Sequence, residues 1–158
     1  MCGMKKSYVA GVVFAVVMVC GVLGFGHSRQ EVQPAVFDHV ALQAVDLEKS
    51  AQFYESVLGL KRIPDPFKDG RHIWLAMGPT QQLHLDPVEK ALPTADDSHM
   101  AVRVGSVEEM IRRLDAAKVK WEGFHGKAQP NLRPDGVHQI YFQDPSGNWV
   151  EVNDRKVE

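Results

Sequence analysis

The chain has 158 residues, a length that suits one domain with a hydrophobic core and is too short for two ordinary domains. Hydrophobic residues make up 44% and charged residues 24%, which is typical of a folded globular protein. The net charge of -2 gives no electrostatic reason to expect nucleic acid as a partner.

The first 26 residues have the pattern of a secretory signal peptide. Lys5 and Lys6 form a positive start, residues 8–25 carry no charge, and small residues suit cleavage before His27. An uncleaved membrane anchor is the alternative, because an uncharged stretch of this length can just span a bilayer. We therefore expect an exported protein, periplasmic or otherwise extracytoplasmic.

The rest of the chain divides into a polar linker, residues 27–35, and a domain, residues 36–158. Both cysteines, Cys2 and Cys20, precede the linker. The domain therefore needs no disulfide and offers no thiolate metal ligand or cysteine nucleophile.

An internal repeat organises the domain. Residues 39–48 (HVALQAVDLE) align without a gap to residues 99–108 (HMAVRVGSVE), an offset of 60 (99 − 39). Each copy predicts a short alternating strand and then a helix, because apolar residues continue at helical spacing. The helices are expected near 47–57 and 107–117, with Asp46 and Ser106 as matched N-caps, a capping box at Ser106–Glu109 and Gly59 ending the first helix.

Three more strands are predicted after each helix. They are residues 60–63, 71–77 and 81–86 in the first copy, and 119–122, 137–143 and 149–153 in the second. The last strands match at an offset of 67 (151 − 84), so the second copy is longer by seven residues (67 − 60), and the loop 123–136 takes them up. Two βαβββ units, residues 36–86 and 98–153, in an α+β fold are therefore predicted.

Strand alternation places one metal-binding side chain on the equivalent face of four strands. Apolar residues are expected to face the helices, and the opposite faces carry His39, His84, His99 and Glu151. Any one of these side chains is ordinary on a half-buried strand. Their recurrence at the two repeat offsets favours a shared site, and three imidazoles with one carboxylate suit a divalent transition metal with two positions open, if six-coordinate, for substrate oxygens.

Three segments resemble the vicinal oxygen chelate superfamily: FDHVALQAVDLEKSAQFYESVLGLK, SHMAVRV and FQDPSGNWVEV. This superfamily contains glyoxalases, methylmalonyl-CoA epimerases, extradiol dioxygenases, and fosfomycin- and bleomycin-resistance proteins. The resemblance covers residues 36–153 and implies a glyoxalase-like fold, in which paired βαβββ units form a cupped mixed sheet, often in a homodimer. It implies one divalent ion (Zn, Ni, Fe, Mn or Co) bound by His39, His84, His99 and Glu151.

The chain departs from the glyoxalase pattern at one ligand position. Glyoxalases of this type usually carry Glu where this sequence has His84. The set His39, His99 and Glu151 instead matches the 2-His-1-carboxylate triad of extradiol dioxygenases, with His84 as an extra donor.

Other residues are expected to face the cavity. We predict His72 and Tyr141 as acid–base groups, and Arg103, Gln43 and Trp74 as substrate contacts. Lys127 and Arg133 lie in the loop 123–136, which forms either a lid with anion contacts or a plain surface connection.

Three functions are open at this point. The first is a glyoxalase- or epimerase-like lyase or isomerase, in which Glu151 moves a proton; His84 and the leader count against lactoylglutathione as its substrate. The second is an extradiol-type dioxygenase using Fe(II), and the third is a non-enzymatic ligand-binding or resistance protein. The expected partners are a small-molecule substrate and a second copy of the chain, without nucleic acid, and with a membrane only if the leader is retained.

Overall fold

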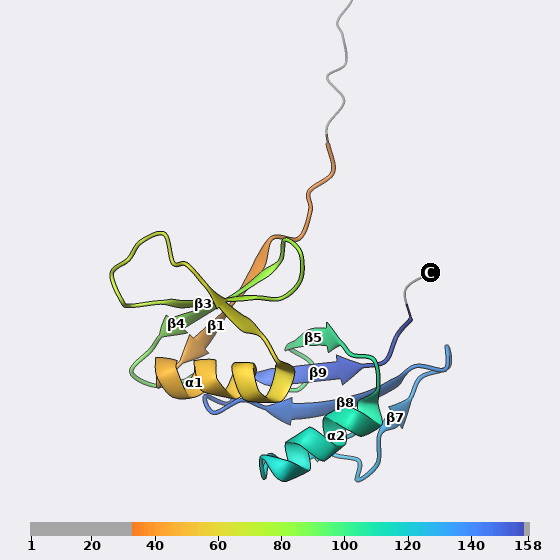
Figure 1. Cartoon of the computed structure of the whole chain (residues 1–158). Coiled ribbons are helices and arrows are strands. Elements are labelled where there is room, and N and C mark those ends of the chain that lie inside the picture. Colours follow the sequence, from red (N-terminus) through yellow and green to blue (C-terminus); the bar gives the residue numbers. More distant parts are fainter. Residues whose placement is uncertain (1–32, 157–158) are drawn as a thin grey trace, which may run out of the picture. The chain divides into compact units, whose positions relative to one another are not determined.

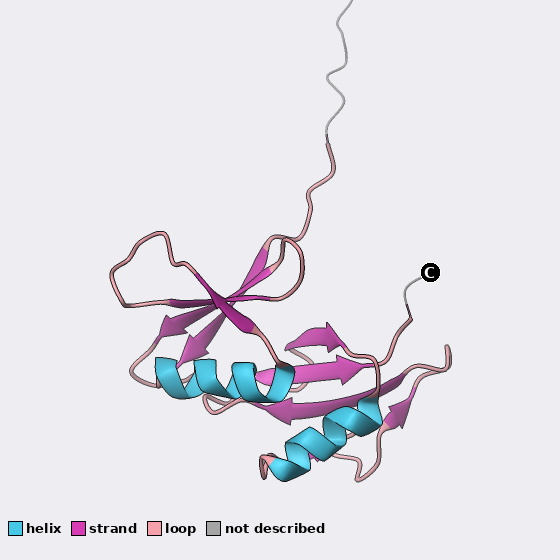
Figure 2. Cartoon of the chain, viewed as in Figure 1, coloured by secondary structure: helices cyan, strands magenta, loops and turns pink. Residues whose placement is uncertain are grey.

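The computed structural model describes residues 33–156, and these contain two successive βαβββ units, the second with one additional short strand (Figures 1 and 2). The first unit consists of β1 (His39–Ala44), α1 (Leu47–Phe53), the π-helical turn η1 (Tyr54–Leu58), β2 (Lys61–Ile63), β3 (Ile73–Ala76) and β4 (Gln82–Pro87). The second consists of β5 (His99–Arg103), α2 (Val107–Ala116), β6 (Trp121–Glu122), β7 (Asn131–Leu132), β8 (His138–Gln143) and β9 (Trp149–Asn153). The predicted α+β class is confirmed.

The predicted signal peptide or anchor, residues 1–26, lies outside the described residues, as does most of the predicted linker. Within residues 33–156, neither helix has the length and apolar character that crossing a membrane requires.

Each unit forms its own mixed sheet, and the two sheets have the same design. The strand orders are β1-β4-β3-β2 and β5-β9-β8-β6, with β7 paired to β8. The first and last strands of each unit are parallel, and their registers correspond: Ala41 pairs with His84, and Ala101 pairs with Glu151. The two repeat offsets read from the sequence therefore describe equivalent positions in three dimensions.

The predicted helix starts are confirmed. Asp46 Oδ1 accepts a hydrogen bond from the Lys49 N–H (3.0 Å), and Ser106 Oγ accepts one from the Glu109 N–H (3.1 Å). The first helix changes to a π-helical turn at Tyr54 and ends at Gly59, whose φ of 72° lies in the left-handed region. The reciprocal half of the predicted capping box is wrong, because the Glu109 carboxylate accepts from Arg112 and Arg113 instead.

The apolar faces of both sheets pack with the helices in one hydrophobic core, as alternation along the strands predicts. Leu83 and Leu85 of β4 and Val150 and Val152 of β9 are fully buried in it. The opposite faces of the same strands are left for the polar residues. The core thus fixes the direction in which the predicted ligands point.

A buried carboxylate joins the two units. Asp144, in the turn between β8 and β9, is 5% exposed and accepts from the Tyr54 hydroxyl of the first unit (2.9 Å). It also accepts from the Ser146 N–H (2.8 Å), the Asn148 N–H (2.9 Å) and the Asn148 side-chain amide (2.8 Å). Burial, and secondarily the Asp144 charge, raise the pKa of Tyr54 well above its usual value, so this phenol stays a donor. The turn therefore fastens one unit to the other.

The segment 123–136 is more ordered than a plain connection. Asn131 and Leu132 form β7 on the outer side of β8, and Gly123 bridges to Lys127. A Cβ at Gly123 would lie 2.1 Å from the Gln129 carbonyl oxygen, so only glycine fits this close approach. The sequence did not predict this strand.

Candidate metal centre

The second unit brings His99 and Glu151 into contact. Their strands are hydrogen-bonded neighbours, and both side chains lie on the sheet face opposite the core. His99 Nε2 is 3.2 Å from Glu151 Oε2. His99 Nδ1 donates to the Asp96 carbonyl oxygen (2.6 Å), which fixes the ring and directs Nε2 toward the carboxylate.

Neutral donors hold both oxygens of Glu151, which is 7% exposed. The Tyr141 hydroxyl (2.7 Å) and the Gln139 amide (3.1 Å) donate to Oε2, and the Asn153 amide donates to Oε1 (2.7 Å). Burial, followed by the hydrogen bond to Glu151, raises the pKa of Tyr141 well above its usual value. Tyr141 is therefore protonated at neutral pH and acts as a donor to the carboxylate.

The first unit brings His39 and His84 together in a different way. His39 Nδ1 donates to Asp38 Oδ2 (2.7 Å), which leaves Nε2 for another partner. The His84 ring lies between two other rings: its centroid is 4.2 Å from that of His39 and 3.8 Å from that of Trp74. His84 Nε2 donates to Gln82 Oε1 (2.8 Å). Burial, followed by the charge of His39, lowers the pKa of His84, so this imidazole is neutral at pH 7.

The two pairs form two half-sites in the part of the chain that is described. Edge strands β1 and β5 lie on either side of a cavity of about 250 Å³, lined among others by Ala41, Leu42, His99 and Met100. Within residues 33–156, no group of close ligand atoms includes His39, His84, His99 and Glu151 together. The single chain therefore presents each predicted pair without joining the pairs.

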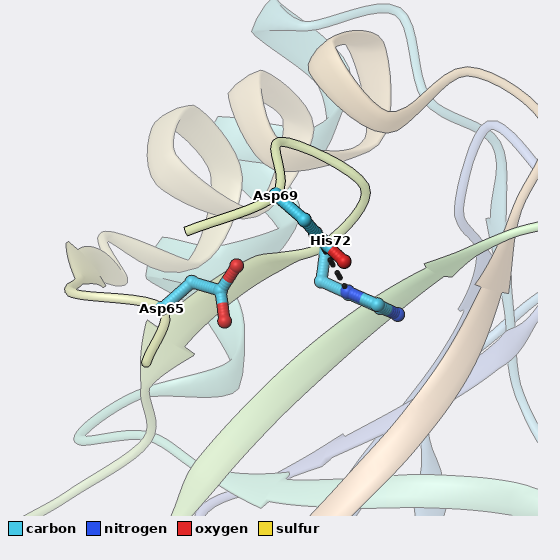
Figure 3. A group of neighbouring side chains, drawn as sticks. All are labelled: Asp65, Asp69 and His72. Atoms are coloured by element: carbon cyan, nitrogen blue, oxygen red, sulfur yellow. Dashed lines mark ion pairs between the residues drawn. The ribbon is translucent and has the colours of Figure 1, made fainter. Parts of the chain in front are cut away.

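Two other groups do bring three ligand atoms within 4.8 Å, Asp65–Asp69–His72 and Asp96–Asp97–His125. Figure 3 shows the first: His72 Nδ1 lies 3.5 Å from Asp69 Oδ1. Asp69 also accepts from the Arg71 backbone and guanidinium, so its charge is already engaged. His72, predicted as an acid–base group, thus lies at the end of the loop 64–72, and its role in proton transfer stays a prediction.

The predicted substrate contacts have different surroundings. The Gln43 amide donates to the Leu92 carbonyl (2.6 Å) and accepts from the Leu92 N–H (2.8 Å), which ties β1 to the segment between the units. Arg103 lines a second cavity of about 330 Å³, together with Phe37 and Met77. Trp74 stacks on His84, and Arg133 pairs with Asp135 (2.6 Å). The substrate roles of Gln43, Arg103 and Trp74 stay predictions.

The sequence prediction missed the residues that orient the ligands: Asp38, Asp96, Gln82, Gln139 and Asn153. Asp38 had a usable signal, because a carboxylate directly before a candidate metal-binding histidine can hold its ring. Gln139 and Asn153 lie two residues from Tyr141 and Glu151 on the same strands, and therefore on the same faces, but alternation alone does not reveal which amide reaches Glu151. Asp96 accepts the His99 hydrogen bond through its backbone carbonyl, and a backbone contact cannot be predicted from the residue type.

The donors present fit a divalent transition metal. His39 and His99 have Nδ1 engaged by an oxygen acceptor, the arrangement that leaves Nε2 as the coordinating atom. Glu151 supplies the anionic oxygen beside His99. Nitrogen and carboxylate donors of this kind suit zinc, nickel, iron, manganese or cobalt, and do not select among them.

Comparison with known proteins agrees with this geometry. The family described as Glyoxalase/Bleomycin resistance protein/Dioxygenase superfamily matches residues 36–152. A lactoylglutathione lyase of Pseudomonas putida is 27% identical over an alignment of 150 residues, covering 74% of this chain and 83% of the relative.

Solved structures share the fold. Lactoylglutathione lyase from Agrobacterium tumefaciens is 25% identical with a TM-score of 0.56, covering 77% of this chain and 94% of that one. The fosfomycin resistance protein FosX from Listeria monocytogenes is 18% identical with a TM-score of 0.65, covering 80% and 95%. The second likeness shows the fold alone.

Proposed function

This chain belongs to the glyoxalase/bleomycin resistance protein/dioxygenase superfamily, and on that premise we propose that it is a metal-dependent lyase or isomerase. Its substrate is a small molecule with two neighbouring oxygen atoms. The ion would be held by His39, His99 and Glu151, with His84 as the fourth ligand in the sequence prediction. The observation that carries this proposal is the matched hydrogen bond from Nδ1 of both His39 and His99 to an oxygen acceptor.

The chain's own residues have separable roles in such a reaction. A bound divalent ion would polarise the substrate oxygens and stabilise negative charge that develops on them. Glu151 is the base in this proposal, and one hydroxyl and two side-chain amides donate to its oxygens. Tyr141 and Gln139 fix the direction of this carboxylate, so a proton can be accepted at a defined place.

An extradiol-type oxygenase is the second candidate. His39, His99 and Glu151 form the 2-His-1-carboxylate set that binds Fe(II) in such enzymes. Aromatic rings also flank both half-sites: Trp74 stacks on His84, and Tyr141 lies edge-on to His99 with centroids 5.2 Å apart. Oxygen uptake by the iron-loaded protein with a catechol would favour this candidate over the first.

We further propose that the protein is a homodimer whose metal sites lie between chains. The two half-sites belong to different sheets, and among the strands of residues 33–156, β1 and β5 each pair with one neighbouring strand. Such free edges are usually paired or covered. Val36 and Phe37, which precede Asp38 and the start of β1, are 80% and 62% exposed, and this adds apolar surface for a second copy to cover.

Metal analysis of the purified protein tests the site. We expect one divalent ion per chain, and His99→Ala should weaken its binding by about 100-fold or more, because losing even a residue that only orients a ligand costs about 10- to 100-fold. His138→Ala is the matched control, since His138 pairs with Asp154 on the same sheet and should keep full metal content. Full metal content in His99→Ala would show that the ligand assignment is wrong.

Mixed dimers test where each site lies. Chains carrying His39→Ala and His99→Ala are co-expressed with different affinity tags, and the mixed dimers are isolated. If sites form between chains, one of the two sites in each mixed dimer is intact, so about one ion per dimer should bind, as two-fold symmetry requires. Metal-free mixed dimers would place each site within one chain, and a monomeric protein would end the dimer proposal.

A further inference from the structure

We infer that His84 is not a metal ligand in this protein but a positioning residue, whose ring holds that of His39 upright on the edge strand. This inference rests on the proposed metal site. The inference departs from the four-ligand set that the repeat pattern predicts. It also gives a structural role to His84, which stands where the glyoxalase pattern has Glu.

The geometry of the rings carries the inference. His39 and His84 lie face to face, with centroids 4.2 Å apart and planes inclined by only 16°. An imidazole nitrogen binds a metal in the plane of its ring, at a distance of about 2.1 Å. Two planes this nearly parallel do not meet within such a distance. His39 and His84 therefore do not share one ion while they are stacked.

The rest of the surroundings keeps His84 in the stack. Its other face lies against Trp74, with centroids 3.8 Å apart and planes inclined by 8°, and these two residues pair directly across β3 and β4. Its Nε2–H donates to Gln82, which faces His39 in the register of β1 and β4. Rotating His84 toward a metal would break its stacking on both His39 and Trp74. The hydrogen bond of His39 to Asp38 uses Nδ1, which leaves Nε2 for a metal.

The consequence is a metal ion with more of its coordination positions left open. With His39, His99 and Glu151 as the only protein ligands, a six-coordinate ion keeps three positions for substrate or oxygen, instead of two. A planar ring at position 84 would be sufficient for this role. A ring nitrogen at that position would not be required.

Two substitutions separate the roles. His84→Phe keeps a flat ring between Trp74 and His39 and removes both nitrogens, whereas His84→Ala removes the ring. We expect His84→Phe to bind metal within about threefold of the wild type. His84→Ala should bind it about tenfold more weakly, which is the usual cost of losing a residue that orients a ligand. A loss with His84→Phe as large as with His99→Ala would overturn the inference, as would wild-type binding by His84→Ala.

Proton NMR of the cobalt(II)-loaded protein gives a second readout. Each coordinated imidazole contributes one strongly shifted, exchangeable N–H signal, so we expect two signals per site, unchanged in His84→Phe. A third signal that disappears in this variant would overturn the inference.

The metal-free protein separates this inference from the proposed function. In that form, the aromatic ring at position 84 should shift the proton NMR signal of His39 Cε1–H in the wild type and in His84→Phe. The shift should vanish in His84→Ala, which has no ring there. A His39 signal that is the same in all three proteins would overturn the positioning role, even if the protein binds no metal at all.

Discussion

Asp144→Ala is expected to lower the free energy of unfolding by about 3–5 kcal/mol, a large share of the roughly 5–15 kcal/mol that stabilises a typical domain. The carboxylate is 5% exposed and accepts four hydrogen bonds, including that from Tyr54 in the other unit. Alanine would leave buried donors without partners, at about 1–3 kcal/mol for each that finds no other acceptor. Urea unfolding followed by tryptophan fluorescence measures the change.

Two variants make this prediction specific. Tyr54→Phe removes one of the four donors and should cost only about 1–2 kcal/mol. Asp154→Ala removes a partly exposed carboxylate that accepts from the His138 N–H and ring, and should cost about 1 kcal/mol. If Asp144→Ala unfolds with the same midpoint as Asp154→Ala, the turn between β8 and β9 does not fasten the units as described.

The sequence predicted the fold because each level of its pattern agrees with the next. The two repeat offsets proved to be the registers that place Ala41 opposite His84 and Ala101 opposite Glu151. N-cap side chains at matched positions confirmed the helix starts. Alternation also identified the core, since the apolar residues expected to face the helices are buried in it or packed against it.

What the sequence could not give is the conformation of individual side chains. Alternation along a strand states which face His84 occupies, but not that its ring turns to lie between His39 and Trp74. For the same reason the sequence did not predict that the Gln43 amide makes two hydrogen bonds to the backbone of Leu92, 49 residues along the chain. The strand β7 has only two residues, too few to form a periodic pattern.

Glu151→Gln is expected to weaken metal binding by about 100-fold or more, with little change in the stability of the metal-free protein. Glutamine keeps the size of the side chain and one acceptor oxygen, but it loses the negative charge and the second acceptor. With the remaining oxygen at the Oε2 position, Tyr141 and Gln139 can still donate to it, and the Asn153 side-chain amide can turn to accept from the new amide nitrogen. The predicted defect is therefore one of binding, because the ion loses its only anionic donor in the proposed set.

Tyr141→Phe is the matched variant for this experiment. It leaves the Glu151 side chain in place and removes one of the two donors described at Oε2, so metal binding should weaken by only about tenfold. Competition with a chelator of known affinity measures both variants, and thermal unfolding of the metal-free proteins checks that the fold is intact. If Glu151→Gln retains metal as well as Tyr141→Phe does, Glu151 acts beside the ion and not on it. The negative charge of the site would then have to come from the substrate, whose two neighbouring oxygens would enter as an anion.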